Sequence, residues 1–313
     1  MTSPPNLALT SVTRRYGAVL GLNDVTVEIG TGITGLVGPN GAGKTTFLNL
    51  AVGLHRPSSG TVRLSGENPF LSAKIRSQIG YCPDGERTWE WMAGREFVVT
   101  LAQWSGLSAT EANLRLDPIL EKLELSDAAH RPIGTYSRGM RQKLKLAQAV
   151  VHKPPFLVLD EPLNGVDPVS RHQILKLLQE RARAGATVIV SSHVLHELGA
   201  FADQVVLLQR GRLLASGTVD SIRDLLDEYP HTVKLSCSNV KKLAAAVLAL
   251  DGTVSVALSE SCDDLEIRTR NPVHFYSKLP QLILSNDLEV THLEPTDSDL
   301  DSVFKYLVKG GAG

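Results

Sequence analysis

The sequence predicts an α/β domain with a largely parallel sheet, followed by a smaller α+β domain. From about residue 7 to residue 226, short aliphatic runs alternate with stretches of helical periodicity. This alternation is typical of a parallel sheet covered by helices. Beyond Pro230 the order of short strands and helices changes. We therefore expect two domains, at residues 1–228 and 229–313.

The composition excludes several classes of protein. Of the 313 residues, 42% are hydrophobic and 21% are charged, which argues against disordered, collagen-like and rod-forming chains. The formal net charge is -1, so no strongly basic surface indicates nucleic-acid binding. Cys82, Cys237 and Cys262 form no zinc or disulfide pattern. Because the apolar runs are too short to span a bilayer, we expect a soluble protein that reaches a membrane only through a partner.

The strands expected in the first domain are short and bounded by glycine, proline or charge. The clearest buried strands are residues 33–37, 156–159 and 187–190, and a helical run at 47–54 follows the first. From residue 94 to about 129 the apolar residues recur at helical spacing, which predicts a helical insert within a helical subdomain at about 94–150. Pro118 predicts a break or a new helix start there, because proline lacks a backbone N–H.

The second domain follows the order β-α-β-β-α-β. Strands are expected at residues 232–237, 254–258, 265–270 and 288–293, with helices at 240–250 and 273–284. This order matches the ferredoxin-like pattern. A last helix is expected at 297–308, where Thr296 and Asp299 are spaced as a capping box. Many unrelated functions use this fold, so the pattern alone assigns no role to the domain.

A glycine-rich loop between the first strand and its helix fits the pattern G-x-x-x-x-G-K-[ST]. Glycines allow successive backbone N–H groups and the helix N-terminus to converge on phosphate oxygens, while the lysine adds positive charge. The adjacent threonine hydroxyl is suited to bind Mg²⁺. A turn that merely caps a helix is the weaker interpretation, because the whole motif has the strand and helix that it needs. Its residues are Gly38, Asn40, Gly41, Ala42, Gly43, Lys44, Thr45 and Thr46.

Two acids end the aliphatic strand at 156–159. Ligands of open parallel sheets bind at the carboxyl ends of the strands, so Asp160 and Glu161 should meet the phosphate loop. Asp160 is suited to hold the shell of Mg²⁺, and Glu161 to orient and deprotonate an attacking water. An ordinary solvated strand end is the alternative, which the phosphate loop makes less favourable.

The order of the motifs resembles that of the ATP-binding cassette (ABC) ATPases. The phosphate loop is followed by Ser-Arg-Gly at 137–139 before a helical run, the Asp-Glu strand, Asn-Gly-Val-Asp at 164–167 and Ser-Ser-His at 191–193. The resemblance covers residues 7–226 and implies a P-loop NTPase fold of the ABC type. The most similar branch is the nucleotide-binding subunit of bacterial exporters whose membrane subunits are separate chains. The segment 293–304 is similar to the tails of that branch.

The resemblance also implies roles for residues outside the phosphate loop. Ser137 and Gly139 would contact the γ-phosphate bound by a second copy, so that ATP joins two subunits; Ser137 also suits an ordinary helix N-cap. His193 would hydrogen-bond the γ-phosphate and the attacking water. Asp167 would face the dimer partner, and Tyr16 would stack on adenine.

Two positions depart from the family pattern. Asp84 lies where the family usually has a glutamine that touches Mg²⁺ and water, and an ionised aspartate cannot donate a hydrogen bond. We expect Asp84 to approach the metal and to slow hydrolysis or change its coupling. Arg138 replaces a glycine and Met140 a glutamine. The bulk of Arg138 should point away from the dimer seam.

The function expected from the resemblance is ATP hydrolysis that powers an exporter. Glu161, His193 and Lys44 are the expected catalytic residues, ATP and Mg²⁺ the cofactors, and Thr45, Asp160 and Asp84 the metal ligands. A second copy and separate transmembrane permease subunits are the expected partners, which would hold the protein at the cytoplasmic face of the membrane. No nucleic acid is expected as a partner.

Two alternatives remain open from the sequence. A cassette that acts on DNA is disfavoured, because the segment between the phosphate loop and residue 137 is too short for a long coiled coil. A cassette that acts on the ribosome is disfavoured, because such members join two cassettes in one chain and this chain has one phosphate loop. The near-neutral charge also disfavours both. A regulatory module that holds nucleotide with weak turnover is compatible with Asp84 and Arg138.

Overall fold

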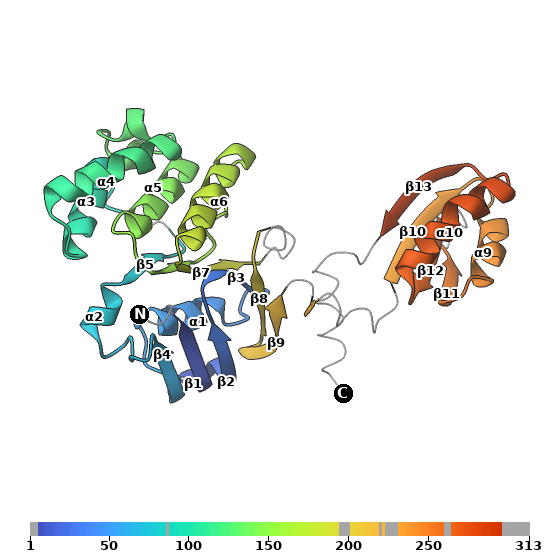
Figure 1. The fold of residues 1–313 in the computed structure, drawn as a ribbon, viewed down its shortest axis with the longest axis horizontal. Coiled ribbons are helices and arrows are strands. Elements are labelled where there is room, and N and C mark those ends of the chain that lie inside the picture. Colours follow the sequence, from blue (N-terminus) through green and yellow to red (C-terminus); the bar gives the residue numbers. More distant parts are fainter. Residues whose placement is uncertain are drawn as a thin grey trace. The chain divides into compact units, whose positions relative to one another are not determined.

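The computed structural model describes residues 6–85, 88–193, 201–218, 221–222, 231–259 and 264–295. The chain forms two compact units, Met1–Gly217 and Thr218–Gly313 (Figure 1). The boundary expected at 228/229 and the last helix expected at 297–308, with its capping box Thr296 and Asp299, lie outside the described residues. Both therefore stay predictions.

A six-stranded sheet forms the centre of the first unit. Its strand order is β5-β6-β7-β3-β8-β9, and the pairs from β5 to β8 are all parallel, which confirms the predicted α/β class. Every residue of β6 and β7 is buried, as expected for parallel strands covered on both faces. The strands are β5 (Ile79–Cys82), β6 (Phe156–Leu159), β7 (Thr187–Ser192), β3 (Gly32–Val37), β8 (Gln204–Gln209) and β9 (Arg212–Thr218).

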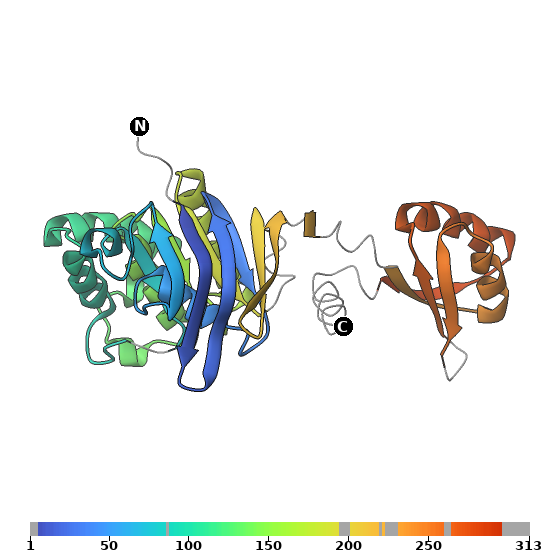
Figure 2. The same ribbon diagram turned by 90° about the horizontal axis from the view of Figure 1, so that it is seen from below.

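A second, antiparallel sheet packs against the first through α1 (Lys44–Ala51). It has the order β2-β1-β4, with β1 (Leu7–Tyr16), β2 (Val19–Ile29) and β4 (Ser59–Leu64). Figure 2 shows the long strands β1 and β2 side by side. Phe47 and Leu48 of α1 are fully buried in a core to which both sheets contribute. This core fixes the start of α1 beside the end of β3.

Four of the described helices lie on the other side of the six-stranded sheet from α1 (Figure 1). They are α3 (Gly94–Trp104), α4 (Ala109–Lys122), α5 (Arg138–Val150) and α6 (Pro168–Arg183), with the 3-10 turns η1 (Ser126–Ala128) and η2 (Ile133–Thr135). A short helix, α2 (Ala73–Arg76), precedes β5. The predicted helical insert is therefore present.

The break expected at Pro118 is wrong, because α4 continues through this residue. Proline inside a helix removes one hydrogen bond and costs about 3 kcal/mol. Ala112, Leu116 and Leu120 are buried on one face of α4, on both sides of the proline. We infer that burial of this apolar face outweighs the local cost and holds the two halves in one helix.

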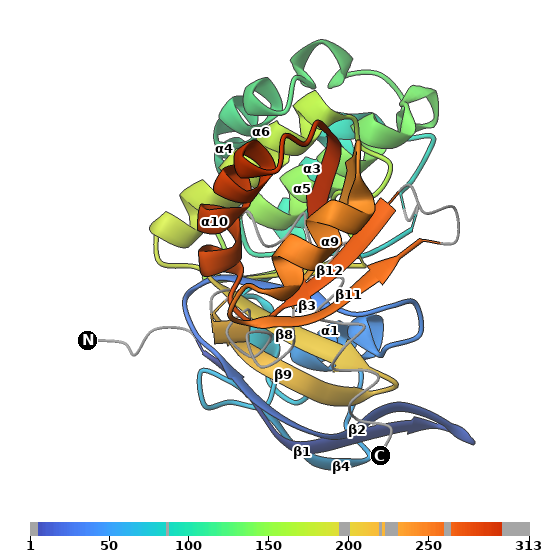
Figure 3. The same ribbon diagram turned by 90° about the vertical axis from the view of Figure 1, so that its right-hand side faces the viewer.

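The described residues of the second unit form a four-stranded antiparallel sheet with two helices on one face (Figure 2 and Figure 3). The strand order β11-β12-β10-β13 interleaves two β-α-β segments, which is the predicted ferredoxin-like arrangement. Its own core includes Leu235, Leu243, Leu265 and Phe275. The elements are β10 (His231–Cys237), α9 (Val240–Leu248), β11 (Thr253–Leu258), β12 (Asp264–Thr269), α10 (Pro272–Ser285) and β13 (Val290–Pro295).

Candidate functional site

The glycine-rich loop joins β3 to α1 and folds tightly around the side chain of Lys44. Lys44 Nζ donates to the carbonyl oxygen of Gly38 at 2.7 Å and lies 3.4 Å from that of Pro39. Gly43 has a φ of 105°, in the left-handed region that favours glycine. A Cβ added to Gly43 would lie 2.5 Å from the carbonyl oxygen of Gly21. The loop conformation therefore requires glycine where the predicted phosphate motif has it.

The loop forms one side of a pocket of ≈ 320 Å³. Tyr16, Asp84, Asp160 and Glu161 contribute to the lining, so the structure brings these predicted site residues to the phosphate loop. The lining also includes Asn40, Gly41, Ala42, Gly43, Lys44, Thr45 and Thr46. Gly38 lies behind them, where a Cβ would come 2.3 Å from the carbonyl oxygen of Leu208.

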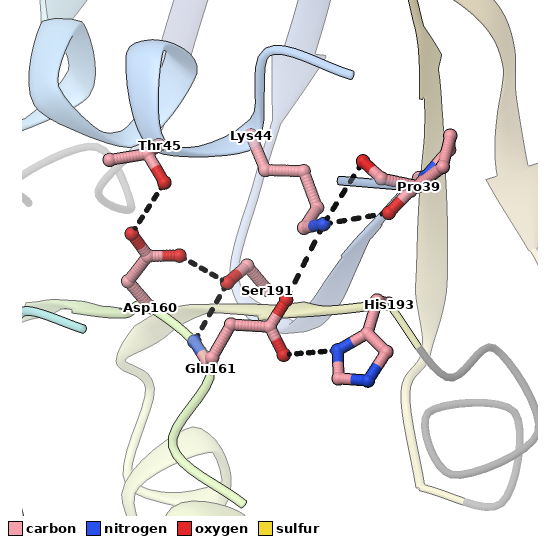
Figure 4. A network of polar contacts seen from close by, with 8 residues as sticks. Pro39, Lys44, Thr45, Asp160, Glu161, Ser191 and His193 are labelled. Atoms are coloured by element: carbon pink, nitrogen blue, oxygen red, sulfur yellow. Dashed lines mark hydrogen bonds and ion pairs between the residues drawn. The ribbon is translucent and has the colours of Figure 1, made fainter. Parts of the chain in front are cut away.

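Asp160 is the buried acid of the site, with 1% of its surface exposed. Thr45 Oγ1 donates to its Oδ2 at 2.9 Å and Ser191 Oγ donates to its Oδ1 at 2.6 Å (Figure 4). Burial raises the pKa of Asp160, while the hydrogen bonds from Ser191 and Thr45 oppose this rise. A buried carboxylate beside a threonine hydroxyl is a hard oxygen donor set that suits Mg²⁺.

Glu161 lies between two nitrogen groups. Its Oε1 is 3.4 Å from Lys44 Nζ, and its Oε2 is 2.9 Å from His193 Nδ1 (Figure 4). The backbone N–H of Glu161 donates to Ser191 Oγ at 2.8 Å. Its φ of 49° is unusual for a residue with a side chain, and such strained residues concentrate at functional sites. The carboxylate is thus held in one orientation at the edge of the pocket.

Tyr16 lies at the end of β1 and lines the pocket of the phosphate loop, with 38% of its surface exposed. The guanidinium of Arg14 lies 4.7 Å from its ring centroid, and the ring of His55 meets it edge-on at 5.6 Å. A Cβ on Gly21 would lie 2.9 Å from Tyr16 Cε2, so glycine leaves room for the ring. An aromatic platform is therefore present where the adenine-stacking role was predicted.

Asp84 follows β5 and lines the same pocket as Asp160 and Glu161. Its charge adds to the forces that raise the pKa of Asp160. Lys145 holds this segment, because its Nζ donates to the carbonyl oxygens of Pro83 at 3.1 Å and Gly85 at 2.7 Å. The backbone on both sides of Asp84 is therefore held from α5.

Ser137 and Asp167 cap two helices outside this pocket. Ser137 Oγ accepts from the N–H of Met140 at 3.2 Å at the start of α5. Asp167 accepts from the N–H of Ser170 at 2.9 Å at the start of α6. The pKa of Asp167 is lowered, first by a hydrogen bond with the side chain of Ser170 and then by this backbone N–H. Neither Ser137 nor Asp167 lines the pocket of its own phosphate loop, and the same is true of Gly139. The N-cap interpretation of Ser137 is confirmed.

Arg138, the first residue of α5, lies against the loop after the acidic strand. A Cβ on Gly165 would come 2.7 Å from Arg138 Nε, so the guanidinium covers this glycine. The φ of Gly165 is 70°. Whether Arg138 avoids a dimer seam stays a prediction.

Three residues of the site were not predicted from the sequence. Ser191 joins the two acids, Lys145 fixes the Asp84 segment, and Gln142 lines a second cavity beside Glu161. Ser191 had a signal in the Ser-Ser-His motif at 191–193, but Gln142 and Lys145 had only their helical spacing. Within the described residues, no helix has the length and apolar character needed to cross a membrane.

Comparisons with known proteins agree with this geometry. The sequence profile described as ABC transporter matches residues 22–164. The bacitracin transport ATP-binding protein of Bacillus licheniformis is 29% identical over 305 residues, which are 96% of this chain and 97% of the relative. The Nod factor export ATP-binding protein I of Burkholderia orbicola is 35% identical over 209 residues, covering 66% of this chain and 69% of the relative. A solved ATP-binding subunit of an ABC transporter has a TM-score of 0.66 and 31% identity, covering 70% of this chain and 92% of that one.

Proposed function

This chain belongs to the ABC transporter family, and we propose that it is the subunit whose ATP hydrolysis powers an exporter. The observation that carries this function is the continuous polar network from Thr45 through Asp160 and Ser191 to Glu161, beside the phosphate loop. The relative named for bacitracin transport supports a role in transport, and the relative named for Nod factor export supports its direction.

Glu161 is the group best placed to take a proton from the attacking water. Lys44 and His193 hold its two oxygens, so that the carboxylate keeps one orientation. The water oxygen bonds to the γ-phosphorus, the bond from that phosphorus to the bridging oxygen of ADP breaks, and the water proton passes to Glu161. Lys44 and the N–H groups of the loop stabilise the charge that develops on the phosphate.

Thr45 and Asp160 are the residues that would hold Mg²⁺, with Asp84 close to them. The fit rests on the burial of Asp160, because a nearby divalent cation offsets the cost of keeping this carboxylate charged. When bound, the metal neutralises phosphate charge.

The third carboxylate, Asp84, adds negative charge to the pocket and favours slow turnover. This is the observation behind the second candidate, a nucleotide-binding regulatory module.

A second copy of the chain is the partner that would complete the site. Ser137 and Gly139 lie at the N-terminus of α5, where a Cβ on Gly139 would meet only Ser137 Oγ, at 4.0 Å. An uncrowded helix N-terminus with a hydroxyl favours an anion. Because these residues lie outside the pocket of their own chain, we assign them to ATP bound by the other copy.

Separate transmembrane permease subunits are the second partner, which would place the protein at the cytoplasmic face of the membrane. We place this contact on the helical insert and the Asp84 segment. The insert and the segment before it carry two tryptophans with large exposed surfaces, Trp91 at 74% and Trp104 at 72%. Exposed aromatic side chains of this size are common at protein interfaces.

The substitution Glu161→Gln tests the assignment. The amide keeps the shape of the side chain but cannot accept the water proton, so we expect hydrolysis to fall about 100- to 10,000-fold. ATP binding should persist and trap a dimer, which analytical ultracentrifugation with Mg²⁺ and ATP measures. Glu180→Gln is the matched control, because Glu180 pairs with Lys122 on the surface. A monomeric Glu161→Gln protein with normal turnover would refute the proposal.

A further inference from the structure

We propose that a second cavity beside Glu161 binds a phosphate-class oxyanion, the inorganic phosphate produced by hydrolysis. The cavity has a volume of ≈ 190 Å³ and lies between one face of α5 and the loops that follow β5 and β6. This inference rests on the proposed ATP hydrolysis. It assigns a destination to the product, which the phosphate loop alone does not.

The wall of the cavity on α5 carries donors and positive charge. Arg138, Arg141, Gln142 and Lys145 line it, and their spacing puts them on one face of the helix. Asp84, Gly85, Glu161 and Asn164 line the opposite side. The cavity lies entirely within the first unit, and its donors face the acid that takes the proton.

Gln142 indicates that this cavity receives an acceptor. Only 8% of its surface is exposed, and its Nε2, which is buried, has no hydrogen-bond partner within the described structure. A buried amide nitrogen without an acceptor costs free energy. A phosphate oxygen that enters the cavity can accept from Nε2 and remove this cost.

The charges around the cavity favour an anion. The ammonium group of Lys145 donates hydrogen bonds to two backbone carbonyls. Among the described residues, neither Lys145 nor Arg138 forms an ion pair with a carboxylate. The charge of Glu161 is compensated by Lys44, whose Nζ lies 3.4 Å from Glu161 Oε1, and its Oε2 is in hydrogen-bond contact with His193. Asp84 alone faces the positive groups without such compensation, so cationic charge is in excess.

The cavity borders the site of the reaction. Asp84 and Glu161 line both this cavity and the pocket of the phosphate loop, so they form a wall that the two share. When Glu161 takes the water proton it becomes neutral, and the wall loses one negative charge as phosphate forms. The smaller volume suits a single phosphate better than a nucleoside triphosphate.

Binding of labelled inorganic phosphate to the full chain saturated with Mg²⁺ and ADP tests the site directly, by equilibrium dialysis. Gln142→Leu and Arg138→Gln should each weaken phosphate binding about tenfold, because each removes a donor to a charged ligand. Affinity for ATP should stay within about twofold, because neither side chain lines the nucleotide pocket. Lys143→Met is the matched control, because this lysine of α5 lies 4.0 Å from Glu124 and outside the cavity.

A single-turnover experiment with ATP labelled in the γ-phosphate identifies the source of the anion. Release of label should be faster in Gln142→Leu and Arg138→Gln than in the unaltered chain. Equal phosphate affinity in all variants would overturn the site. Weakened binding of added phosphate with unchanged release would overturn the product as its ligand. Absence of hydrolysis in the unaltered chain would instead contradict the proposed function, whatever the dialysis shows.

Discussion

Replacing Ser191 with alanine removes the hydroxyl that joins the two acids of the site. Ser191 is fully buried, donates to Asp160 Oδ1 at 2.6 Å and accepts from the backbone N–H of Glu161 at 2.8 Å. Alanine satisfies neither group. The buried carboxylate loses one of its two hydroxyl donors, and the N–H of the strained residue loses its acceptor.

The two losses set the size of the effect. A hydrogen bond to a charged group contributes about 1.5–3 kcal/mol, and a buried N–H without an acceptor costs about 1–3 kcal/mol. Ser191 also borders a cavity of ≈ 160 Å³, from which water can replace part of what is lost. We therefore expect the free energy of unfolding to fall by about 3 kcal/mol. The pKa of Asp160 should rise further, because the hydrogen bond from Ser191 now lowers it.

Urea unfolding followed by tryptophan fluorescence measures this loss. The three tryptophans of the chain, Trp89, Trp91 and Trp104, all lie in the first unit, so their signal reports the unfolding of that unit. With a slope of about 2 kcal/mol/M, the midpoint should fall by about 1.5 M urea. The slope itself should not change, because the surface exposed on unfolding is nearly the same.

A double-mutant cycle with Asp160→Asn identifies the cause. In that background the charged hydrogen bond is already gone, so Ser191→Ala should cost only about 1–2 kcal/mol. A loss below about 0.5 kcal/mol in the unaltered background, or the same loss in both backgrounds, would refute the reasoning.

Two further substitutions or treatments test local features. Glu161→Gly should be about 1 kcal/mol more stable than Glu161→Ala, because glycine adopts the φ of 49° without strain and alanine does not. Both variants should lose hydrolysis. The opposite order of stability in urea titrations would contradict the left-handed backbone at this residue. Burial raises the pKa of Cys82 from 9.0 to about 12, so iodoacetamide at pH 8 should label this thiol only after unfolding, as read by mass spectrometry. The thiol ionises near pH 9 in the unfolded chain and near pH 12 in the folded chain, so its ionisation lowers the free energy of unfolding progressively as the pH rises from about 9 to about 12. Below about pH 9 its ionisation leaves the free energy of unfolding unchanged. Labelling of the folded chain at pH 8 would contradict the burial of Cys82.

Local pattern was sufficient for the elements whose burial is uniform. The strand at 156–159 was predicted with its observed bounds, because a short aliphatic run between proline and two acids has few other solutions. The phosphate loop could also be predicted from the sequence, because its glycines are required by the backbone conformation of the loop itself. Pro118 shows where local rules fail, because packing on both sides of the proline determines whether α4 continues.

Contacts between distant segments could not be predicted in the same way. Gln142 and Lys145 lie on an ordinary helical pattern, and their importance depends on which loops of the sheet face α5. The covering of Gly165 by Arg138 likewise depends on the meeting of two segments that are separate in the sequence. Residue type and spacing describe a helix face, but they do not say what lies opposite it.

The pairing of β10 with β13 determines how the small unit responds to mechanical load. Val233, near the start of β10, lies opposite Pro295 at the end of β13, so the backbone enters and leaves at the same end of the sheet. Tension applied through these two ends would break the backbone hydrogen bonds between β10 and β13 one after another, instead of loading all of them at the same time. Because the start of β10 and the end of β13 lie next to each other, this unit is also suited to insertion into a surface turn of another protein through two short connectors.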